Sequence, residues 1–239
     1  MTISLVRDVN PIESVKAVVL KPGYGYIWII NFNSSTTSEL EKALKKLESG
    51  EGSLRGLILD FRNNGGGLLD QAIKVSDLFL EDGTIVTIKG RLRRNNMLFT
   101  AHPLEVNRDY PIVVLINEAS AAASEIVAGA LQDNKRALVL GTKSHGHGTI
   151  QTTELLRDGS GLKLTIATSY TPSGRSIQNE AIIPDVVVKA RFTSEKDIFY
   201  GDNLLFKKKD EKKHLNIVER LSLDNQVRRA LEVVVQMEK

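Results

Sequence analysis

Residues 112–141 read IVVLINEASAAASEIVAGALQDNKRALVLG, and this stretch decides the fold class. It opens with five consecutive apolar residues, 112–116, which is the length and composition of a buried strand. After a short polar loop, residues 121–132 are rich in small residues and indicate a helix. Residues 137–140 then form a second apolar run. A strand, a helix and a strand in this order predict a parallel unit with a right-handed crossover.

The same order occurs earlier in the chain. Residues 56–61 are an apolar strand, residues 62–67 read RNNGGG, and apolar residues at helical spacing follow over 69–79. Before them, residues 24–32 predict a buried strand, and residues 36–50 predict an amphipathic helix whose Thr36 and Glu39 resemble a capping box. Strands alternating with helices predict an α/β fold with a mainly parallel sheet.

The pattern changes after Gly141. Residues 149–155 and 162–169 alternate like strands on either side of the turn sequence RDGSG, so they predict an antiparallel hairpin. Residues 184–188 predict a further short strand. A final helix is indicated by apolar residues at helical spacing, namely Val227, Ala230, Leu231 and Val234.

Composition removes several classes of protein. The 239 residues include 41% hydrophobic residues, which is typical of globular chains and not of disordered or collagen-like ones. Positive and negative charges nearly balance at a net +3, so the overall charge gives no argument for nucleic-acid binding. The basic run 207–213, KKKDEKK, is interleaved with acids and predicts a solvated linker. The absence of cysteine excludes disulfides, thiolate metal sites and cysteine nucleophiles.

No stretch of sequence has the length and apolar content of a membrane span. The amino terminus, MTISLVR, lacks both a basic start and an apolar run of secretory length. A chain exported after removal of a leader would have the same sequence.

The glycine loop at residues 65–67 follows the end of a predicted strand and precedes a helix, which is where open α/β sheets bind ligands. Its free backbone N–H groups favour an anion, so it could form an oxyanion hole or hold a phosphate. The alternative is a tight turn that needs positive φ. The loop fits neither the dinucleotide-binding glycine pattern nor a phosphate-binding loop with Lys-Ser/Thr.

Several ordered motifs together resemble the carboxy-terminal processing peptidases, also called tail-specific proteases. They are the stretch quoted above, GYI at 25–27, DFRNNGGG at 60–67, GHGTIQ at 146–151, YTPSGR at 170–175 and PD at 184–185. The resemblance implies a core like that of crotonases and caseinolytic proteases, with a PDZ domain usually inserted ahead of it. It also implies cleavage of proteins near their carboxyl termini by a serine-lysine dyad, without a cofactor, and action outside the cytoplasm.

The resemblance implies a division of the chain and leaves a homo-oligomer open. Residues 1–20 would be a remnant of the PDZ edge with a linker, of which residues 3–7 would be a strand. Residues 21–190 would be the protease core. Residues 191–239 would be an extension whose helix packs back on the core. The expected partners are carboxyl-terminal tails of proteins or peptides.

The site residues follow position by position. The nucleophile position is Ala122, the general-base lysine position is His147, and the residue that orients the base is Gln151. Backbone donors for an oxyanion or substrate loop would come from Gly65, Gly66, Gly67 and Ala123. Asp133 matches an acidic position and is interpreted as structural support at the helix end.

Two of the three catalytic positions depart from the family pattern. A methyl group has no lone pair, so Ala122 cannot attack a carbonyl. Ser120 and Ser124 each lie two positions from Ala122, a rotation of about 200° on a helix, which directs them elsewhere. The sequence therefore predicts an inactive protease core, whether the substitutions are natural or were introduced to trap substrate.

Other hypotheses remain open at this stage. His145 and His147 could face the same way, but a third ligand is missing, so no metal site is predicted. A non-catalytic protein that binds peptides or acts as a scaffold has the same sequence pattern. A crotonase-like acyl-thioester enzyme shares the oxyanion chemistry, although the GHGTIQ segment and the turn after the hairpin argue against it.

Overall fold

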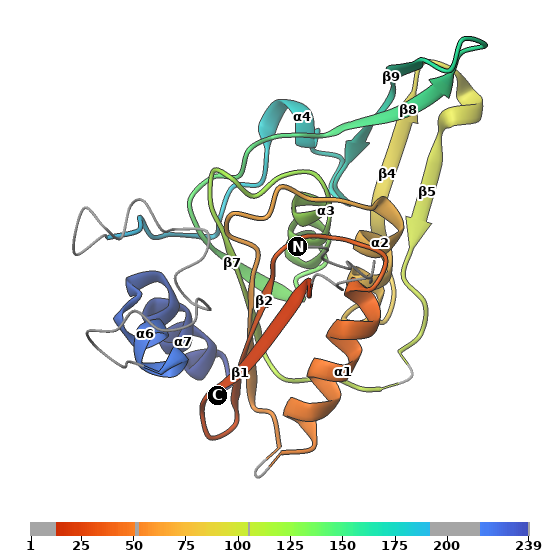
Figure 1. The fold of residues 1–239 in the computed structure, drawn as a ribbon. Helices are drawn as coiled ribbons and strands as arrows, with labels where there is room; N and C mark the ends of the chain where they lie inside the picture. Colours follow the sequence, from red (N-terminus) through yellow and green to blue (C-terminus); the bar gives the residue numbers. More distant parts are fainter. Residues whose placement is uncertain (1–12, 51–52, 105, 192–215, 239) are drawn as a thin grey trace, which may run out of the picture.

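The computed structural model describes residues 13–50, 53–104, 106–191 and 216–238, so the expected strand at 3–7 and the run 207–213 lie outside it. The core is a six-stranded sheet with the strand order β1-β2-β3-β6-β7-β10 (Figure 1). β1 pairs antiparallel with β2, and the other pairs are parallel. The strands are β1 Val15–Lys21, β2 Tyr24–Ile29, β3 Gly56–Asp60, β6 Ile112–Ile116, β7 Ala137–Gly141 and β10 Val186–Val187. The predicted α/β class with a mainly parallel sheet is confirmed.

Helices cover both faces of this sheet (Figure 1). Alternate strand residues point to opposite faces. Ile27, Leu57 and Val114 join the core under α1, α2 and α3, whereas Tyr26, Ile58 and Val113 join the core under α7. The helices are α1 Thr36–Glu48, α2 Leu69–Asp77, α3 Ala123–Asp133, α4 Ile177–Glu180, α6 Ile217–Leu223 and α7 Asn225–Met237. Burial on both faces explains why the central strands read as continuous apolar runs.

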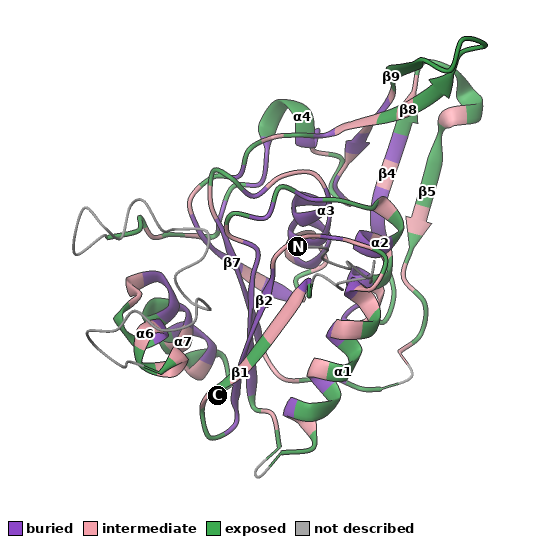
Figure 2. Cartoon of the chain, in the orientation of Figure 1, coloured by how far each residue is buried: buried purple, intermediate pink, exposed green. Residues whose placement is uncertain are grey.

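A second, antiparallel sheet projects from the core with the strand order β5-β4-β9-β8. Its strands are β4 Thr84–Gly90, β5 Met97–Thr100, β8 Thr149–Leu155 and β9 Gly161–Tyr170, and the short helix η1 Arg93–Asn95 connects β4 to β5. The predicted hairpin is β8–β9. Figure 2 shows that this sheet is buried near the core and becomes exposed towards its far end.

The structure differs from the sequence-based expectations at several element ends. The first helix has Ser35 as its N-cap, and the Glu39 carboxylate accepts hydrogen bonds from Ser35 Oγ at 2.5 Å and Ser14 N at 2.7 Å. The expected Thr36–Glu39 capping box is therefore wrong, because Glu39 binds neighbours in space instead. The strand expected over 24–32 ends at Ile29, and the one expected over 184–188 is reduced to two residues.

Candidate functional site

The site forms where two neighbouring parallel strands end. β3 is followed by the glycine loop, and β6, its hydrogen-bonded neighbour, is followed by the loop that enters α3. Both loops therefore leave the sheet at the same edge, which is where open α/β sheets bind ligands. Tertiary structure thus brings together two segments separated by more than fifty residues of sequence.

Ala122 forms a sharp turn between strand and helix. Its φ of 50° and ψ of −109° are rare for a residue with a side chain, and α3 begins only after it, at Ala123. The helix expected from residue 121 therefore starts two residues later. Such a backbone costs about 1–3 kcal/mol and persists only where its surroundings hold it. The same strand-to-helix elbow presents the nucleophile in α/β-hydrolases. The elbow conformation is present here although its side chain is only a methyl group.

Glu125 holds this elbow against the loop that carries His147. Its side chain is fully buried. One carboxylate oxygen, Oε2, accepts hydrogen bonds from Ala122 N at 2.9 Å and His147 N at 2.8 Å. The other, Oε1, accepts them from Ser144 Oγ at 2.5 Å and Gly146 N at 2.7 Å. One carboxylate therefore positions the backbones of Ala122 and His147 relative to each other.

The glycine loop packs directly against the elbow. A Cβ atom added to Gly66 would lie 2.7 Å from Ala122 Cβ, so only glycine allows this approach. Gly67 has a φ of 142°, and a Cβ there would lie 2.1 Å from the carbonyl oxygen of Phe32. The loop therefore needs its glycines for positive φ and close backbone contact, which is the structural interpretation the sequence left open.

Asn64 fixes the loop from within. Its buried side chain donates from Nδ2 to the Ile29 carbonyl at 2.7 Å and accepts from Gly66 N at 2.8 Å. Its backbone carbonyl accepts from Ala121 N at 2.9 Å. Because Asn64 occupies the Gly66 amide, that N–H is not available to a substrate.

The amides of Gly65, Gly67 and Ala123 remain as donors. None of the three has an acceptor among the described residues, and Ala123 begins a helix, where the first N–H groups have no intrahelical partner. Three of the four amides expected to form an oxyanion loop are therefore free to donate, and their binding of an oxyanion stays a prediction.

Ser120 and Ser124 are held in structural roles. Ser120 Oγ donates to the Phe61 carbonyl and Ser124 Oγ to the Asn64 carbonyl, each at 2.8 Å, and both residues are fully buried. Each hydroxyl proton is directed at a backbone carbonyl of the loop after β3. Neither hydroxyl is presented to the solvent side of the elbow.

Gln151 lies in β8 of the antiparallel sheet and His147 precedes that strand by two residues, and both side chains are exposed. His147 Nε2 lies 3.4 Å from Thr149 Oγ1. Within the described residues no hydrogen bond joins Gln151 to His147, so the orienting contact implied for this pair is not formed here. Among the described residues, which include His145, no three metal-binding side chains lie close enough together to hold an ion.

Asp133 lies at the far end of α3 from the elbow. Its carboxylate forms an ion pair with Arg175 at 2.5 Å and accepts a hydrogen bond from Ser173 N at 2.9 Å. Burial on its own would raise the pKa of Asp133, but hydrogen bonds from Thr171 and Ser173 and the charge of Arg175 outweigh it and lower that pKa. Asp133 therefore ties the turn after β9 to the end of α3.

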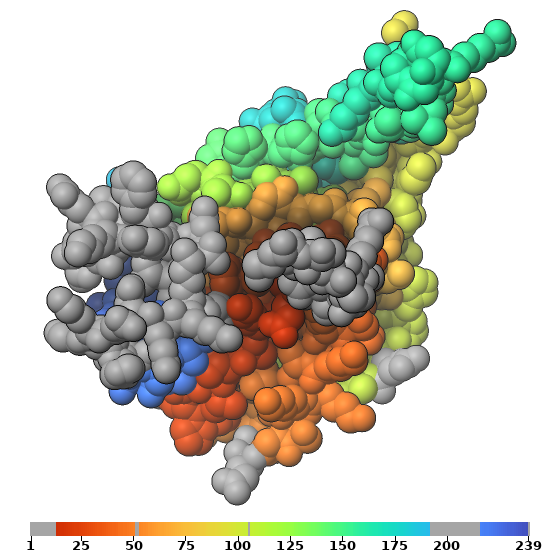
Figure 3. All heavy atoms as spheres, viewed as in Figure 1, coloured from red at the N-terminus to blue at the C-terminus, as the bar shows by residue number. Residues whose placement is uncertain are grey.

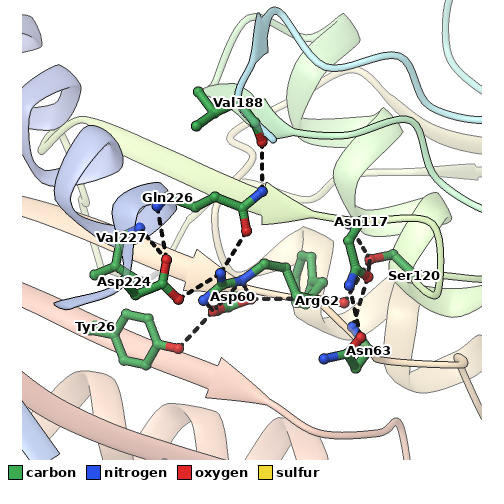
Figure 4. A network of polar contacts seen from close by, with 11 residues as sticks. Tyr26, Asp60, Arg62, Asn63, Asn117, Ser120, Val188, Asp224, Gln226 and Val227 are labelled. Carbon is green, nitrogen blue, oxygen red and sulfur yellow. Dashed lines mark hydrogen bonds and ion pairs between the residues drawn. The ribbon is translucent and has the colours of Figure 1, made fainter. Parts of the chain in front are cut away.

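A buried ionic network supports the glycine loop from the opposite face of the sheet (Figure 4). Arg62 pairs with Asp60 at 2.6 Å and with Asp224, the N-cap of α7, at 2.8 Å. Tyr26 donates to Asp60 at 2.7 Å, and Gln226 accepts from Arg62 at 2.7 Å. Burial on its own would lower the pKa of Arg62, but the charges of Asp60 and Asp224 hold it well above its usual value. The carboxyl-terminal helices are thereby fastened to the strand end that carries the loop.

The sequence interpretation gave no role to Asn64, Glu125 or Arg62. Glu125 had a signal, because a glutamate three positions after a helix N-cap is half of a capping box. Asn64 and Arg62 lie in the DFRNNGGG motif, but nothing in the sequence indicated their distant partners. Asn64 reaches Ile29, 35 positions away, and Arg62 reaches Asp224, 162 positions away.

A strained elbow at a helix start, with backbone amides packed beside it, is an arrangement that presents nucleophiles in α/β-hydrolases. The comparisons define the family: Peptidase family S41 matches residues 23–188, and the chain belongs to it. The carboxy-terminal-processing protease of Bartonella bacilliformis is 47% identical over 191 residues, covering 79% of this chain and 44% of that protein. The chloroplastic C-terminal processing peptidase of Tetradesmus obliquus is 37% identical over 198 residues, covering 77% and 42%.

A solved structure of the photosystem II D1 C-terminal processing protease has the same fold. It superposes with a TM-score of 0.67 at 34% identity, covering 75% of this chain and 49% of that one. The core resembling crotonases and caseinolytic proteases is thereby shown. The chain spans less than half the length of each of these relatives.

Proposed function

We propose that this chain is the core of a carboxy-terminal processing peptidase that holds carboxyl-terminal protein segments without hydrolysing them. The observation that carries the proposal is the Ala122 elbow, which keeps its strained backbone and its Glu125 tether while lacking a nucleophile. The family membership and the names of the relatives support the substrate class. A location outside the cytoplasm is part of the proposal and rests on the family resemblance.

With both substituted positions reverted, the site would contain the parts of an acyl-transfer reaction. A serine at 122 would attack the scissile carbonyl, and a neutral lysine at 147 would take its proton. Free amides of the glycine loop and Ala123 would stabilise the oxyanion. The lysine would then give the proton to the leaving amine. With a methyl group at 122 the first bond cannot form, so the remaining chemistry is binding.

Peptide binding has a candidate surface in β8. This strand is the outer edge of the antiparallel sheet and begins two residues after His147. An unpaired edge offers backbone N–H and C=O groups to an extended chain. A peptide paired with this edge would run along the antiparallel sheet towards the Ala122 elbow.

Reversion of the two substituted positions tests the proposal. An unstructured protein is incubated with the unmodified chain, Ala122→Ser, and Ala122→Ser/His147→Lys, and the products are measured by mass spectrometry. We expect no cleavage, at most a trace, and measurable cleavage, respectively. Loss of the nucleophile in serine proteases costs on the order of a million-fold in turnover. Retained peptide on the unmodified chain would show binding.

A matched control is Ala122→Ser/His145→Lys, which adds the same lysine two positions away and should stay inactive. Cleavage by the unmodified chain would refute the proposal, because it requires a nucleophile other than residue 122. A folded double revertant that neither cleaves nor retains peptide would also refute it.

A further inference from the structure

The far end of the antiparallel sheet exposes a concentration of apolar side chains. Half of the large hydrophobic residues that are exposed in the described chain lie there. They are Leu92, Met97, Leu98, Leu155, Leu156, Leu162 and Leu164. Leu155 is the most exposed, at 81%. Apolar residues at this density on a surface usually mark an interaction site.

The same end carries most of the excess positive charge of the chain. Six cations lie in residues 89–98 and 154–164, namely Lys89, Arg91, Arg93, Arg94, Arg157 and Lys163, against the two carboxylates Glu154 and Asp158. The resulting net charge of +4 exceeds the +3 of the whole chain. Of these cations only Lys89 has a partner among the described residues, the ring of Tyr170. The others are exposed without a carboxylate partner.

The hairpin β8–β9 extends well beyond its neighbours. The last pair between β4 and β9 is Gly90 with Ala167, and β9 continues outward for six more residues, to Gly161. At about 3.3 Å per residue this is roughly 20 Å of chain without β4 beside it. Figure 3 shows the end as a convex projection from the body of the molecule.

The leucines of this tip lie on both faces of the hairpin. Leu162 is paired with Glu154, and Gly161 is paired with Leu155, so Leu155 and Leu162 point to opposite faces. A protein partner with a flat surface would cover one face and leave the other exposed. A lipid bilayer surrounds an inserted tip on every side. Leucines that penetrate the headgroups, with arginines beside them at the phosphates, are the pattern of interfacial membrane binding.

We propose that the tip formed by residues 89–98 and 154–164 docks on an anionic lipid bilayer. The leucines enter the headgroup region and the arginines contact lipid phosphates. A nucleic acid is disfavoured, because the exposed leucines would gain nothing from its backbone. The docking is independent of hydrolysis and would hold the peptidase site at a membrane surface. None of the helices in the described ranges has the length and apolar content of a membrane span.

Flotation of the full chain with lipid vesicles tests this. Vesicles of phosphatidylcholine alone are compared with vesicles in which a third of the lipid is phosphatidylglycerol. We expect binding to the anionic vesicles that weakens in 1 M salt, where the screening length is about 3 Å. Arg91→Gln/Arg93→Gln/Arg94→Gln should weaken partitioning by about fivefold per cation, on the order of a hundredfold together. Leu155→Ser/Leu156→Ser should weaken it by at least about tenfold.

The matched control removes three cations from another face. Lys42→Gln/Lys45→Gln/Lys46→Gln on α1 makes the same change in net charge and should retain most of the binding. Failure of the unmodified chain to bind anionic vesicles at low salt would overturn the proposal. An equal loss in the α1 variant would also overturn it, and so would complete loss on substituting Lys207, Lys208 and Lys209.

Light scattering distinguishes a second copy of the chain from lipid. A dimer that Leu155→Ser/Leu156→Ser converts to a monomer would make the tip a self-association surface and refute lipid docking. The arginine variant changes only exposed side chains, so it is expected to fold even if the leucine variant does not. Because vesicle binding is read without any substrate, its outcome does not depend on whether the chain binds or cleaves peptides.

Discussion

Replacing Glu125 by glutamine is expected to destabilise the fold strongly, because no orientation of an amide satisfies the donors around it. Each carboxylate oxygen of Glu125 accepts two hydrogen bonds. An NH2 group at the Oε2 position faces two backbone donors, Ala122 N and His147 N. At the Oε1 position it faces Gly146 N and the Ser144 hydroxyl, which can turn to accept, so at least one backbone donor loses its acceptor in either orientation. A hydrogen bond to a charged group contributes about 1.5–3 kcal/mol, so the loss is at least of that size. For a chain of this size that corresponds to a fall in Tm of roughly 3–12 °C.

Urea unfolding measures this loss through fluorescence of the single tryptophan, Trp28, which is buried. The matched control is Glu118→Gln, in the loop between β6 and α3. The exposed Glu118 carboxylate accepts one side-chain hydrogen bond, from Thr142 at 2.7 Å. The control should change the free energy of unfolding by no more than about 1 kcal/mol. If Glu125→Gln is as stable as Glu118→Gln, the buried carboxylate does not hold the elbow to the His147 loop.

Three further predictions concern the same region. Gly67→Ala should prevent stable folding, because its Cβ would lie 2.1 Å from a carbonyl oxygen. The control Gly65→Ala, whose Cβ would have nothing within 4 Å, should unfold at nearly the urea midpoint of the parent chain, and equal midpoints for the two variants would refute the close approach. Ala122→Gly should leave the free energy of unfolding unchanged or raise it by up to about 1 kcal/mol, because glycine adopts the positive φ without strain. The control Ala128→Gly, inside α3, should lower the free energy of unfolding by about 1 kcal/mol or more, and a similar loss in both variants would show that the elbow is unstrained. The folded-state pKa of Asp133 lies below its unfolded value, so the carboxylate's contribution to stability is complete above about pH 4 and is lost as the pH falls through the folded pKa. The difference in free energy of unfolding between the parent chain and Asp133→Asn should therefore shrink from pH 6 to acidic pH, and a constant difference would refute the lowered pKa.

The elements with strong apolar periodicity were predictable from sequence. Residues 112–116, 137–140 and the hairpin strands appear in the structure within one or two residues of the expected ends. Six elements were missed: β1, β4, β5, η1, α4 and α6. β5 has four residues and α6 seven, too few to show a period. β1 is an edge strand with mostly part-buried or exposed side chains, so its alternation is weak.

The sequence by itself determined which chemical groups are present. The missing hydroxyl at Ala122, the absence of cysteine and the glycines at 65–67 are properties of the residues, and no fold can add an atom to them. The order of strands and helices also followed from local periodicity, because apolar residues repeat at the spacing of the element that buries them. These properties were enough to indicate the family and the fold class, and they predict the loss of the nucleophile.

Tertiary structure alone decided which groups meet. The positive φ of Ala122 follows from the Glu125 tether and from the glycine loop packed beside it, and a short run of alanines gives no sign of it. The hydrogen bond from Gly66 N to the Asn64 side chain depends on how that side chain is oriented, since it could have pointed to solvent. The physical reason is that hydrogen bonds and close contacts depend on distances in space, and residues far apart in sequence become neighbours only when the sheet forms.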